Sequence, residues 1–265
     1  MTVPDPLPSI AELYDLRGRS AVITGAAQGI GAAIARRLAE AGADLFLIDV
    51  DETHLCATRD ALKKWGPKVE IRIADVARED ALTSACKDCV ELLEKIDIWV
   101  NNAGIAPRSP VLEISSAEWD KVLDLNLRGA FIGAKCAART MIERGRGGVI
   151  VNIASSTVYR VTANPVHYRV SKAGLVALTQ SLAIELGGSG IRVLAIAPTL
   201  TATPGVQYLR NMGLSAGLDE FVRRLPLKRI ATPDEVARVV LFAVSDMAVF
   251  MTGTVLTVDG GETHK

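Results

Sequence analysis

The stretch Ser20-Ala-Val-Ile-Thr-Gly-Ala-Ala-Gln-Gly-Ile-Gly31 joins a short apolar run to three glycines. The apolar run predicts a buried strand over residues 20–24, and the residues after the glycines predict a helix over 32–41 that ends at Gly42. Glycines at such a turn let the backbone turn tightly and approach a pyrophosphate closely. The first N–H groups of the helix then point at the phosphates. We interpret this stretch as the phosphate-binding end of a dinucleotide site.

The same order of strand and helix repeats along the rest of the chain. An alternation of this kind implies a parallel sheet with right-handed crossovers and helices on both faces. Further strands are expected at 45–48, 69–73, 96–100, 149–154, 191–196 and near 254–258, and helices at 52–64, 79–94, 116–143, 166–187 and 233–244. We find no repeat and no polar linker. We therefore predict one α/β domain over residues 18–265, a Rossmann-type doubly wound sheet of about seven parallel strands, preceded by an N-terminal arm over 1–17.

Composition and charge narrow the classes of function. Lysine plus arginine balances aspartate plus glutamate at 30 each, so no global field favours nucleic acid or a membrane surface. No apolar run approaches the ~20 residues that span a bilayer, and no signal peptide is evident. We expect a soluble cytoplasmic protein whose partner is a small-molecule substrate.

The four cysteines suit a reducing compartment better than a disulfide framework. Cys86-x-x-Cys89 resembles a redox or metal pair, but it lies inside a predicted helix with no second pair and no nearby histidine. We interpret this pair as structural and expect no metal site.

Carboxylates and amides follow three of the predicted strands. Asp49 ends the second strand, where it can accept hydrogen bonds from an adenosine ribose and repel a 2′-phosphate. No lysine or arginine directly follows it, which favours NAD over NADP. Asp75, after the third strand, could meet an adenine amino group. Asn101, after the fourth, could support the cofactor or simply brace a loop.

Tyr168 and Lys172 lie one helical turn apart in Tyr168-Arg-Val-Ser-Lys172. A lysine ammonium favours the phenolate, which lowers a tyrosine pKa that starts near ~10. Ser155 follows the apolar run 149–154, so its hydroxyl should lie at the carboxyl end of a strand, where open α/β sheets bind ligands. An ordinary surface contact between residues four apart is the alternative. The rest of the chain favours a proton-transfer site.

Four motifs now stand in order: Thr24-Gly-x-x-x-Gly-Ile-Gly31, Asn101-Asn-Ala-Gly104, Ser155 and Tyr168-x-x-x-Lys172. Together they resemble the short-chain dehydrogenase/reductase family, from about Gly18 to Gly261. The resemblance implies that Tyr168 is the acid/base and that Ser155 orients the reacting oxygen. It also implies that Lys172 lowers the tyrosine pKa and holds the nicotinamide ribose. Asn126 resembles the family asparagine that kinks the long helix and holds a water of the proton relay.

The resemblance also implies a cofactor-binding set, in which Asp75-Val76 lies beside the adenine and Thr203 contacts the nicotinamide carboxamide. One departure is Ala197-Pro198-Thr199, where the family usually has Pro-Gly. A second is Arg169, where the family residue is generally small. The full set is Gly25, Gln28, Gly29, Ile30, Gly31, Asp49, Asp75, Val76, Asn102, Ala103, Gly104, Tyr168, Lys172, Pro198, Thr201 and Thr203.

The substrate is less well specified. The usual substrate lid corresponds to residues 201–227, and the expected substrate contacts are Arg108, Thr157, Arg160, His167 and Tyr208. Arginine and other polar groups favour a polar sugar, polyol or acidic alcohol. Apolar neighbours such as Val158 and Met212 leave an apolar alicyclic alcohol or hydroxysteroid open. His167 also has a purely structural interpretation.

Several functions compete. The first is an NAD-dependent alcohol or sugar dehydrogenase. An NADPH-dependent 3-ketoacyl reductase is disfavoured by Asp49, and a non-catalytic nucleotide-binding scaffold would not need Ser155, Tyr168 and Lys172 together. An epimerase or dehydratase usually needs a separate substrate lobe. The resemblance also implies a homotetramer or homodimer, with the long helices 116–143 and 166–187 paired across symmetry axes.

Overall fold

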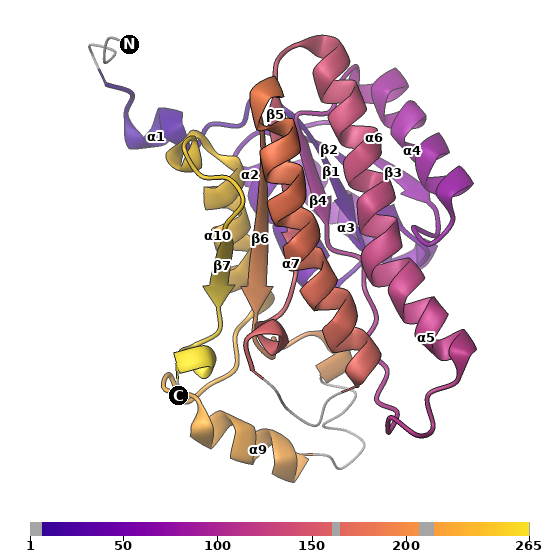
Figure 1. The fold of residues 1–265 in the computed structure, drawn as a ribbon. Coiled ribbons are helices and arrows are strands. Elements are labelled where there is room, and N and C mark those ends of the chain that lie inside the picture. The colour runs from indigo at the N-terminus through magenta and orange to yellow at the C-terminus, as the bar shows by residue number, and fades with distance from the viewer. Residues whose placement is uncertain (1–6, 161–164, 207–214, 265) are drawn as a thin grey trace.

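The computed structural model describes residues 7–160, 165–206 and 215–264. Its centre is a seven-stranded sheet in the order β3-β2-β1-β4-β5-β6-β7, in which every neighbouring pair is parallel (Figure 1). The predicted doubly wound α/β architecture is confirmed. The strands are β1 (Ser20–Thr24), β2 (Asp44–Asp49), β3 (Val69–Ile73), β4 (Ile98–Asn101), β5 (Gly148–Ile153), β6 (Ile191–Pro198) and β7 (Val255–Val258).

Helices cover both faces of the sheet (Figure 1). One core cluster joins the sheet to α2 (Gly29–Glu40), α3 (Glu52–Leu62) and α10 (Pro233–Val244). The other joins it to α4 (Glu79–Leu93), α6 (Gly129–Arg144) and α7 (Val166–Leu186). Successive strand residues alternate between the two clusters: Ala21 and Ile23 enter the first, and Val22 enters the second. Because both faces are buried at the centre of the sheet, β1, β4 and β5 are largely apolar runs, whereas the edge strand β3 also carries Glu70 and Arg72.

The long helix expected over 116–143 is interrupted. It consists of α5 (Ser116–Leu123), a π-helical turn (Asp124–Arg128) and α6. The π turn contains the buried Asn126, so the kink falls where the family resemblance puts it. In the described ranges, no helix has both the length and the apolar character that crossing a membrane requires.

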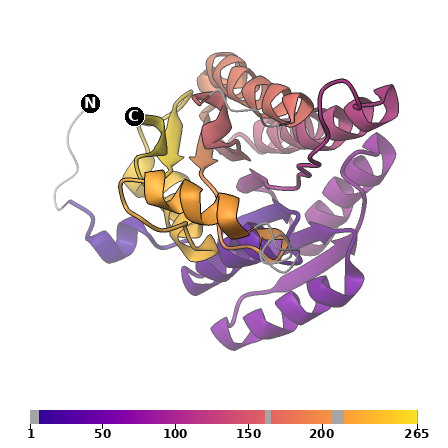
Figure 2. The ribbon, with the colours of Figure 1, turned by 90° about the horizontal axis from the view of Figure 1, so that it is seen from below.

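The strand order reverses between β1 and β4, and this reversal determines where a ligand can bind. Open α/β sheets bind ligands beyond the carboxyl ends of the strands at such a point. Figure 2 looks toward this end of the sheet and shows α9 (Ser215–Arg224), from the expected lid, lying across it.

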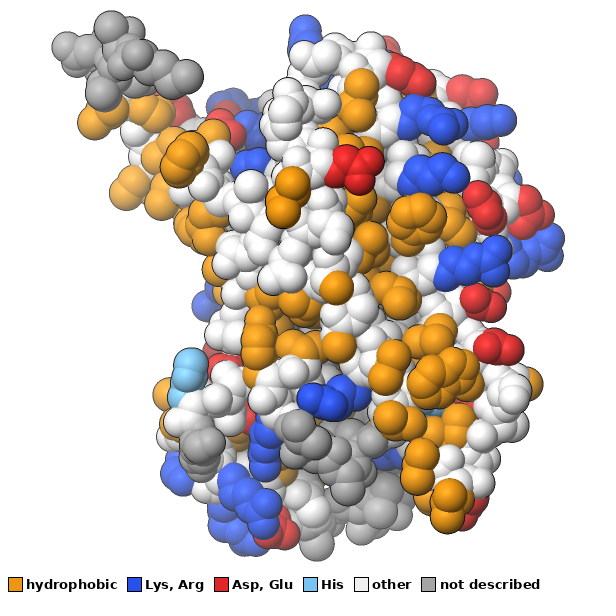
Figure 3. Space-filling view, viewed as in Figure 1, with side chains coloured by type: hydrophobic (Ala, Val, Ile, Leu, Met, Phe, Trp, Pro, Cys, Tyr) orange, Lys and Arg blue, Asp and Glu red, His pale blue; other side chains and the backbone are white. Residues whose placement is uncertain are grey.

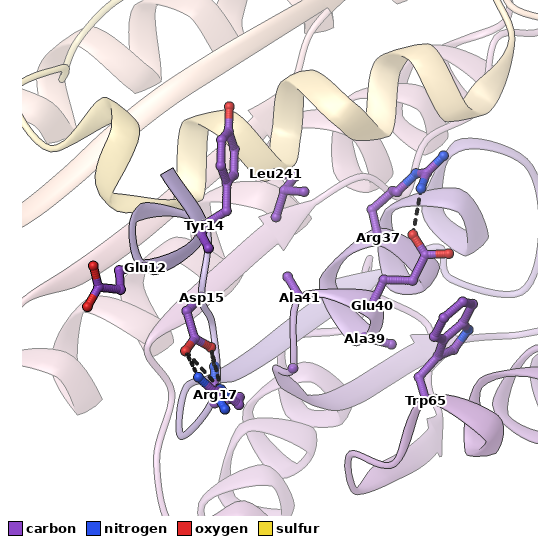
Figure 4. A pocket seen from close by; sticks show the side chains of 12 residues that line it. Glu12, Tyr14, Asp15, Arg17, Arg37, Ala39, Glu40, Ala41, Trp65 and Leu241 are labelled. Carbon is purple, nitrogen blue, oxygen red and sulfur yellow. Dashed lines mark hydrogen bonds and ion pairs between the residues drawn. The ribbon is translucent and has the colours of Figure 1, made fainter. Parts of the chain in front are cut away.

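The opposite end of the sheet holds the N-terminal arm. Part of this arm is helical, in α1 (Ile10–Leu13), and the buried Leu16 anchors it by donating its N–H to the carbonyl of Ala41. A hollow of about 600 Å³ lies between this arm and the end of α2 (Figure 4). Its charged groups already have partners: Asp15 pairs with Arg17, Glu40 pairs with Arg37, and Glu12 accepts from Ser9. We therefore look for the functional site at the carboxyl end.

The close approach of α6 to β4 gives a stability prediction. A Cβ on Gly133 would lie 2.7 Å from a ring carbon of the buried Trp99 and 2.8 Å from Oδ1 of Asn101. We expect Gly133→Ala to lower the free energy of unfolding by about 1–3 kcal/mol, although alanine is the better helix former. Urea denaturation measures this change.

Gly187→Ala is the matched control, because a Cβ there would meet nothing within 4 Å and the backbone is helical, with φ −57°. We expect this variant to match or slightly exceed the wild-type stability. A Gly133→Ala protein as stable as the wild type would show that α6 can move away from Trp99.

Candidate active site

The glycine-rich loop between β1 and α2 leaves no room for a side chain at its three glycines. Gly25 and Gly29 adopt φ +65° and +59°, and a Cβ on Gly31 would lie 2.0 Å from the carbonyl oxygen of Gly25. Gln28, which precedes α2, makes no side-chain hydrogen bond to the start of the helix among the residues described. The first N–H groups of α2 are thus available to an anion. This backbone cradle fits the pyrophosphate of a dinucleotide.

The end of β4 braces this loop. The side-chain amide of Asn102 donates to the carbonyls of Thr24 and Gly25, each at 2.9 Å. The backbone N–H groups of Asn102 and Ala103 both donate to Oγ1 of Thr24. Asn101 points the other way, into the core, where it accepts from Trp99 Nε1 at 2.6 Å. Of its two predicted roles, the structural one agrees with this position.

Asp49 fixes a negative charge at the end of β2, beside the glycine-rich loop. Its Oδ2 accepts from the N–H of Ala27 at 2.9 Å, and its Oδ1 accepts from the N–H groups of Val50 and Asp51. The arginines of α2 are balanced elsewhere: Arg36 pairs with Glu40, and Arg37 pairs with Glu40 and Asp234. Both guanidinium groups already have carboxylate partners, so neither is free to bind a 2′-phosphate.

Two other predicted cofactor residues follow β3. Val76 is buried, and a Cβ on Gly129 would lie 2.7 Å from its carbonyl oxygen, so it packs under the start of α6. Asp75 accepts from the N–H of Ala77 at 2.9 Å, which shapes the turn after the strand. These residues and Asp49 lie at the ends of adjacent strands.

Ser155 and Tyr168 face each other at the carboxyl end of β5. Ser155 follows this strand and is buried, and its Oγ accepts from the N–H of Thr157 at 3.3 Å. Tyr168 lies in the first turn of α7. Burial raises the pKa of Tyr168 above its ordinary value, and a hydrogen bond with the Ser155 hydroxyl acts in the opposite direction.

Lys172 is held one turn further along α7. Its side chain is buried, and its Nζ donates to the carbonyl oxygen of Ile153 at 2.7 Å, at the end of β5. The same nitrogen lies 5.8 Å from the centre of the Tyr168 ring. Burial lowers the pKa of Lys172 to about 8.

These pKa directions correct one expectation. The sequence predicted a Tyr168 pKa below the ordinary value, because an ammonium follows one turn later. In the structure, the effect of burial on the phenol is the largest, so the pKa of Tyr168 is raised. The Lys172 ammonium donates a hydrogen bond to the carbonyl of Ile153. The hydrogen bond between Ser155 and Tyr168 and the 5.8 Å approach of Lys172 Nζ to the Tyr168 ring still bring the three side chains together, and their catalytic roles stay a prediction.

Asn126 connects the π turn to α7. Its amide accepts from the N–H of Ile105 at 2.8 Å and donates to Ile105 O at 2.9 Å. It also donates to Oγ of Ser171 at 3.0 Å, and Ser171 donates to the carbonyl of Tyr168 at 2.7 Å. Sequence reasoning missed Ser171, although it lies inside the tyrosine–lysine motif. The chain of bonds fixes the turn of α7 that carries Tyr168.

For His167 the sequence left a substrate contact and a structural role open. Its ring is fully buried, Nε2 lies 2.9 Å from Glu118 Oε1 of α5, and Nδ1 accepts from the N–H of Tyr168. Hydrogen bonds from His167 and Ser109 lower the pKa of Glu118. Of the two predicted interpretations of His167, the structural one agrees with these contacts, which position the start of α7.

The other predicted substrate residues differ in whether their side chains are paired, buried or exposed. Arg160 donates to Glu262 at 3.0 Å, so its charge is already paired. The hydroxyl of Thr157 is buried without a partner among the described residues, and its carbonyl accepts from Arg169 at 3.0 Å. Arg108 is exposed. Tyr208 lies outside the described residues.

The segment after β6 approaches the glycine-rich loop. A Cβ on Gly29 would lie 3.2 Å from Cγ2 of Thr203, which brings this predicted cofactor residue to the cradle. Thr201 is buried, and its hydroxyl donates to the carbonyl of Thr199 at 2.9 Å. Pro198 ends β6. The structure thus gathers the predicted cofactor residues along one rim.

The predicted helix over 79–94 holds the cysteine pair. Cys86 and Cys89 are both buried in the core beneath α4. Burial raises the pKa of Cys89 to about 12, which disfavours the thiolate that a metal needs. Over residues 7–160, 165–206 and 215–264, no group of histidines, cysteines and acids is arranged to hold a metal ion.

Comparisons with known proteins agree over almost the whole chain. The family model described as enoyl-(acyl carrier protein) reductase matches residues 25–263. Cis-4-hydroxycyclohexanecarboxylate dehydrogenase of Sinomonas cyclohexanicum is 40% identical over 92% of this chain and 96% of its own. Levodione reductase of Leifsonia aquatica is 38% identical over 92% and 94%.

A solved structure gives the same result. The crystal structure of a provisional NAD(P)-dependent gluconate 5-dehydrogenase from Beutenbergia cavernae contains NADP at low occupancy. It is 34% identical to this chain, covers 96% of it and 100% of its own length, and matches with a TM-score of 0.89. The fold, the glycine cradle and these matches show that the chain belongs to the short-chain dehydrogenase/reductase family, whose members are oxidoreductases that act on alcohols and carbonyls.

Proposed function

We propose that this protein is an NAD-dependent dehydrogenase that oxidises a secondary alcohol or reduces the corresponding carbonyl compound. The single observation that carries the proposal is the approach of the Ser155, Tyr168 and Lys172 side chains to one another at the rim that also holds the glycine cradle. When bound there, the nicotinamide supplies the hydride acceptor. The protein supplies position and proton transfer.

In this mechanism each side chain has one task. In oxidation, the Tyr168 phenolate accepts the proton of the substrate hydroxyl. The Ser155 hydroxyl donates to the substrate oxygen and keeps it within reach of the phenol. The Lys172 ammonium stabilises the phenolate through space, and Asn126 keeps the helix turn in place through Ser171. In reduction, Tyr168 returns the proton.

Asp49 supports NAD as the cofactor. We propose that Gly25, Gln28, Gly29, Ile30 and Gly31 hold the pyrophosphate and that Asp49 accepts from the ribose hydroxyls. A 2′-phosphate would meet the Asp49 carboxylate, and the arginines of α2 are already paired. The remaining contacts of the proposed set are Asp75, Val76, Asn102, Ala103, Gly104, Tyr168, Lys172, Pro198, Thr201 and Thr203.

For the substrate, we propose a polar or acidic secondary alcohol, with sugars and polyols in the same class. The exposed Arg108 supports this choice, because a guanidinium binds carboxylates well. The similarity to a dehydrogenase named for a hydroxycyclohexanecarboxylate also supports it. An apolar alicyclic alcohol is the second candidate, favoured by the similarity to levodione reductase. A cofactor-reduction screen over sugars, sugar acids and alicyclic alcohols with and without a carboxylate distinguishes the two.

We also propose a homotetramer, or a homodimer, as the assembly. Apolar side chains are exposed along α6 and α7, and Figure 3 shows hydrophobic groups over this face of the molecule. They include Phe131, Val170 and Ile184, the last with 87% of its surface exposed. A surface of this kind on parallel neighbouring helices suits contact with a second copy.

Removal of the phenol hydroxyl tests the reaction. We expect Tyr168→Phe to lower kcat by about 10²–10⁴-fold, because the proton acceptor is lost. NADH binding, followed by protein-to-cofactor fluorescence transfer, should stay within about twofold of the wild type. Turnover close to the wild-type value would remove the proposed mechanism.

Substitution of Asp49 tests the cofactor. We expect the wild type to prefer NAD over NADP in kcat/KM. Asp49→Asn keeps an acceptor for the Ala27 N–H but removes the charge, so it should narrow the preference by about tenfold, equal to about 1.4 kcal/mol. Asp60→Asn, an exposed carboxylate of α3 paired with Lys63, is the control and should leave the ratio unchanged. A wild type that prefers NADP would contradict the proposal.

The pH dependence tests the role of Lys172. Because the pKa of Tyr168 is raised, the phenolate is the minor form at neutral pH, so alcohol oxidation should accelerate as pH rises from neutral toward about 8. Above about pH 8 Lys172 loses the proton that stabilises the phenolate, so the acceleration should weaken. Carbonyl reduction uses the protonated phenol and should slow as pH rises. Lys172→Met removes the stabilising charge, which should move the oxidation profile to higher pH and weaken cofactor binding. An unchanged profile would show that Lys172 does not stabilise the phenolate.

A further inference from the structure

A carboxylate from the C-terminal turn is buried beside the candidate site. Glu262 belongs to the 3₁₀ turn Glu262–His264, and only 8% of its side chain is exposed. Its Oε2 accepts from the hydroxyls of Ser156 at 2.7 Å and Thr199 at 2.6 Å. Its Oε1 accepts from the Arg160 guanidinium at 3.0 Å. A buried carboxylate needs partners of this kind, and these three come from positions 63 to 106 residues away in sequence.

The two segments held by Glu262 are those that flank the proposed reaction centre. Ser156 directly follows Ser155, and Arg160 lies four residues further along the chain. Thr199 directly follows Pro198 at the end of β6 and leads to Thr201, which is bonded to its carbonyl. One carboxylate therefore connects the end of β5 to the end of β6. It does so through Ser156, the neighbour of Ser155, and through Thr199, the neighbour of Pro198.

The turn that carries Glu262 is itself fixed. The carboxylate of Asp259 accepts from the N–H groups of Gly261 and Thr263 and from the Thr263 hydroxyl, at 2.6–3.0 Å. Gly261 has φ +85°, and a Cβ there would lie 2.6 Å from Pro226. The position of Glu262 is thus fixed by contacts within its own turn and with Pro226, so its carboxylate can hold the two loops in place.

Thr199 reaches Glu262 through its side chain. The threonine hydroxyl contributes the shortest of the three bonds to the carboxylate, at 2.6 Å. This hydroxyl is therefore the link between Glu262 and the end of β6.

We propose that Glu262 is a positioning residue that acts through Ser156 and Thr199: it holds the Ser155 loop and the segment after β6 in the arrangement that hydride transfer needs. The proposal rests on the proposed function for its kinetic part. Loss of the carboxylate should let the loop 155–160 move, which lowers kcat. The KM for NAD should rise less than kcat falls, because the pyrophosphate cradle on β1 and α2 keeps its contacts, and only the proposed contacts that follow Thr199 are loosened.

The test uses two substitutions of Glu262 in the full-length protein. Glu262→Ala removes all three acceptor interactions, and Glu262→Gln keeps the shape but loses the charge that binds Arg160. With the alcohol found in the screen, we expect kcat to fall by about tenfold in Glu262→Ala and by less in Glu262→Gln, the scale of one or two lost hydrogen bonds. The KM for NAD should rise by a smaller factor than the fall in kcat.

The matched control is Glu40→Gln. Glu40 is also a partly buried carboxylate that pairs with arginines, Arg36 and Arg37, but it lies at the far end of α2. Its kcat should equal that of the wild type. If Glu262→Ala lowers stability but leaves kcat equal to that of the control, Glu262 is only a structural residue and the proposal is overturned.

A double-mutant cycle isolates the contact with Thr199. Thr199→Val keeps the volume and removes the hydroxyl. It should lower kcat by about threefold in the wild type and have almost no further effect in Glu262→Ala, because the partner is already gone. Independent effects of the two substitutions would show that Thr199 does not act through Glu262.

Hydrogen exchange separates this proposal from the proposed function. Amides of residues 153–160 and 198–202 should exchange faster in Glu262→Gln than in the wild type or Glu40→Gln, while those of β1 and α2 stay unchanged. If the wild type transfers no hydride to any compound in the screen, the proposed function fails, and the exchange data still decide the holding role. Unchanged exchange in both loops would overturn that role.

Discussion

The bond from the Lys172 ammonium to the carbonyl of Ile153 is the contact on which the site depends. It joins α7 to the last residue of β5, two positions before Ser155. With that bond in place, Tyr168 lies one turn back along α7 and faces Ser155. A buried ammonium is costly without a partner, so the strand end and the helix are held at a fixed separation.

Other bonds make this junction rigid from two sides. Asn126 on the π turn bonds Ser171 and so fixes the backbone of the Tyr168 turn, while Glu118 on α5 bonds His167. On the opposite side, Arg169 donates to the loop that follows Ser155. The irregular turn in the long helix has a clear purpose here, since a regular helix would not present Asn126 to α7 in the same way. Rigid surroundings of this kind are what proton transfer between fixed groups requires.

Local patterns in the sequence were enough to predict much of this structure. The central strands are short apolar runs, and each glycine of the first turn serves a steric need. The sheet, the alternation of strands and helices and the cradle therefore follow from residues that are close in sequence. The motif with Tyr168 and Lys172 likewise depends on helical spacing alone. The roles of these residues in catalysis and cofactor binding remain predictions.

What could not be predicted depends on residues far apart in sequence. The sequence predicted Arg160 as a substrate contact, but it gave no sign of the ion pair with Glu262, which lies about a hundred residues further along the chain. For His167 the sequence left a substrate contact and a structural role open, and only the fold shows its ring buried against α5. The direction of the Tyr168 pKa depends on how deeply the fold encloses the phenol, and no local pattern reports that depth. Burial and long-range pairing are properties of the packed chain.

The edge of the sheet at β3 has a consequence for how copies of the chain can meet. An edge strand with open N–H and C=O groups invites another strand to pair with it. Here the strand carries Glu70 and Arg72, and Arg72 forms an ion pair with Asp88 of α4. Charges on an edge disfavour strand-to-strand stacking and the fibrous aggregates that it starts. Association through helix faces therefore carries a lower risk of uncontrolled growth than extension of the sheet at β3.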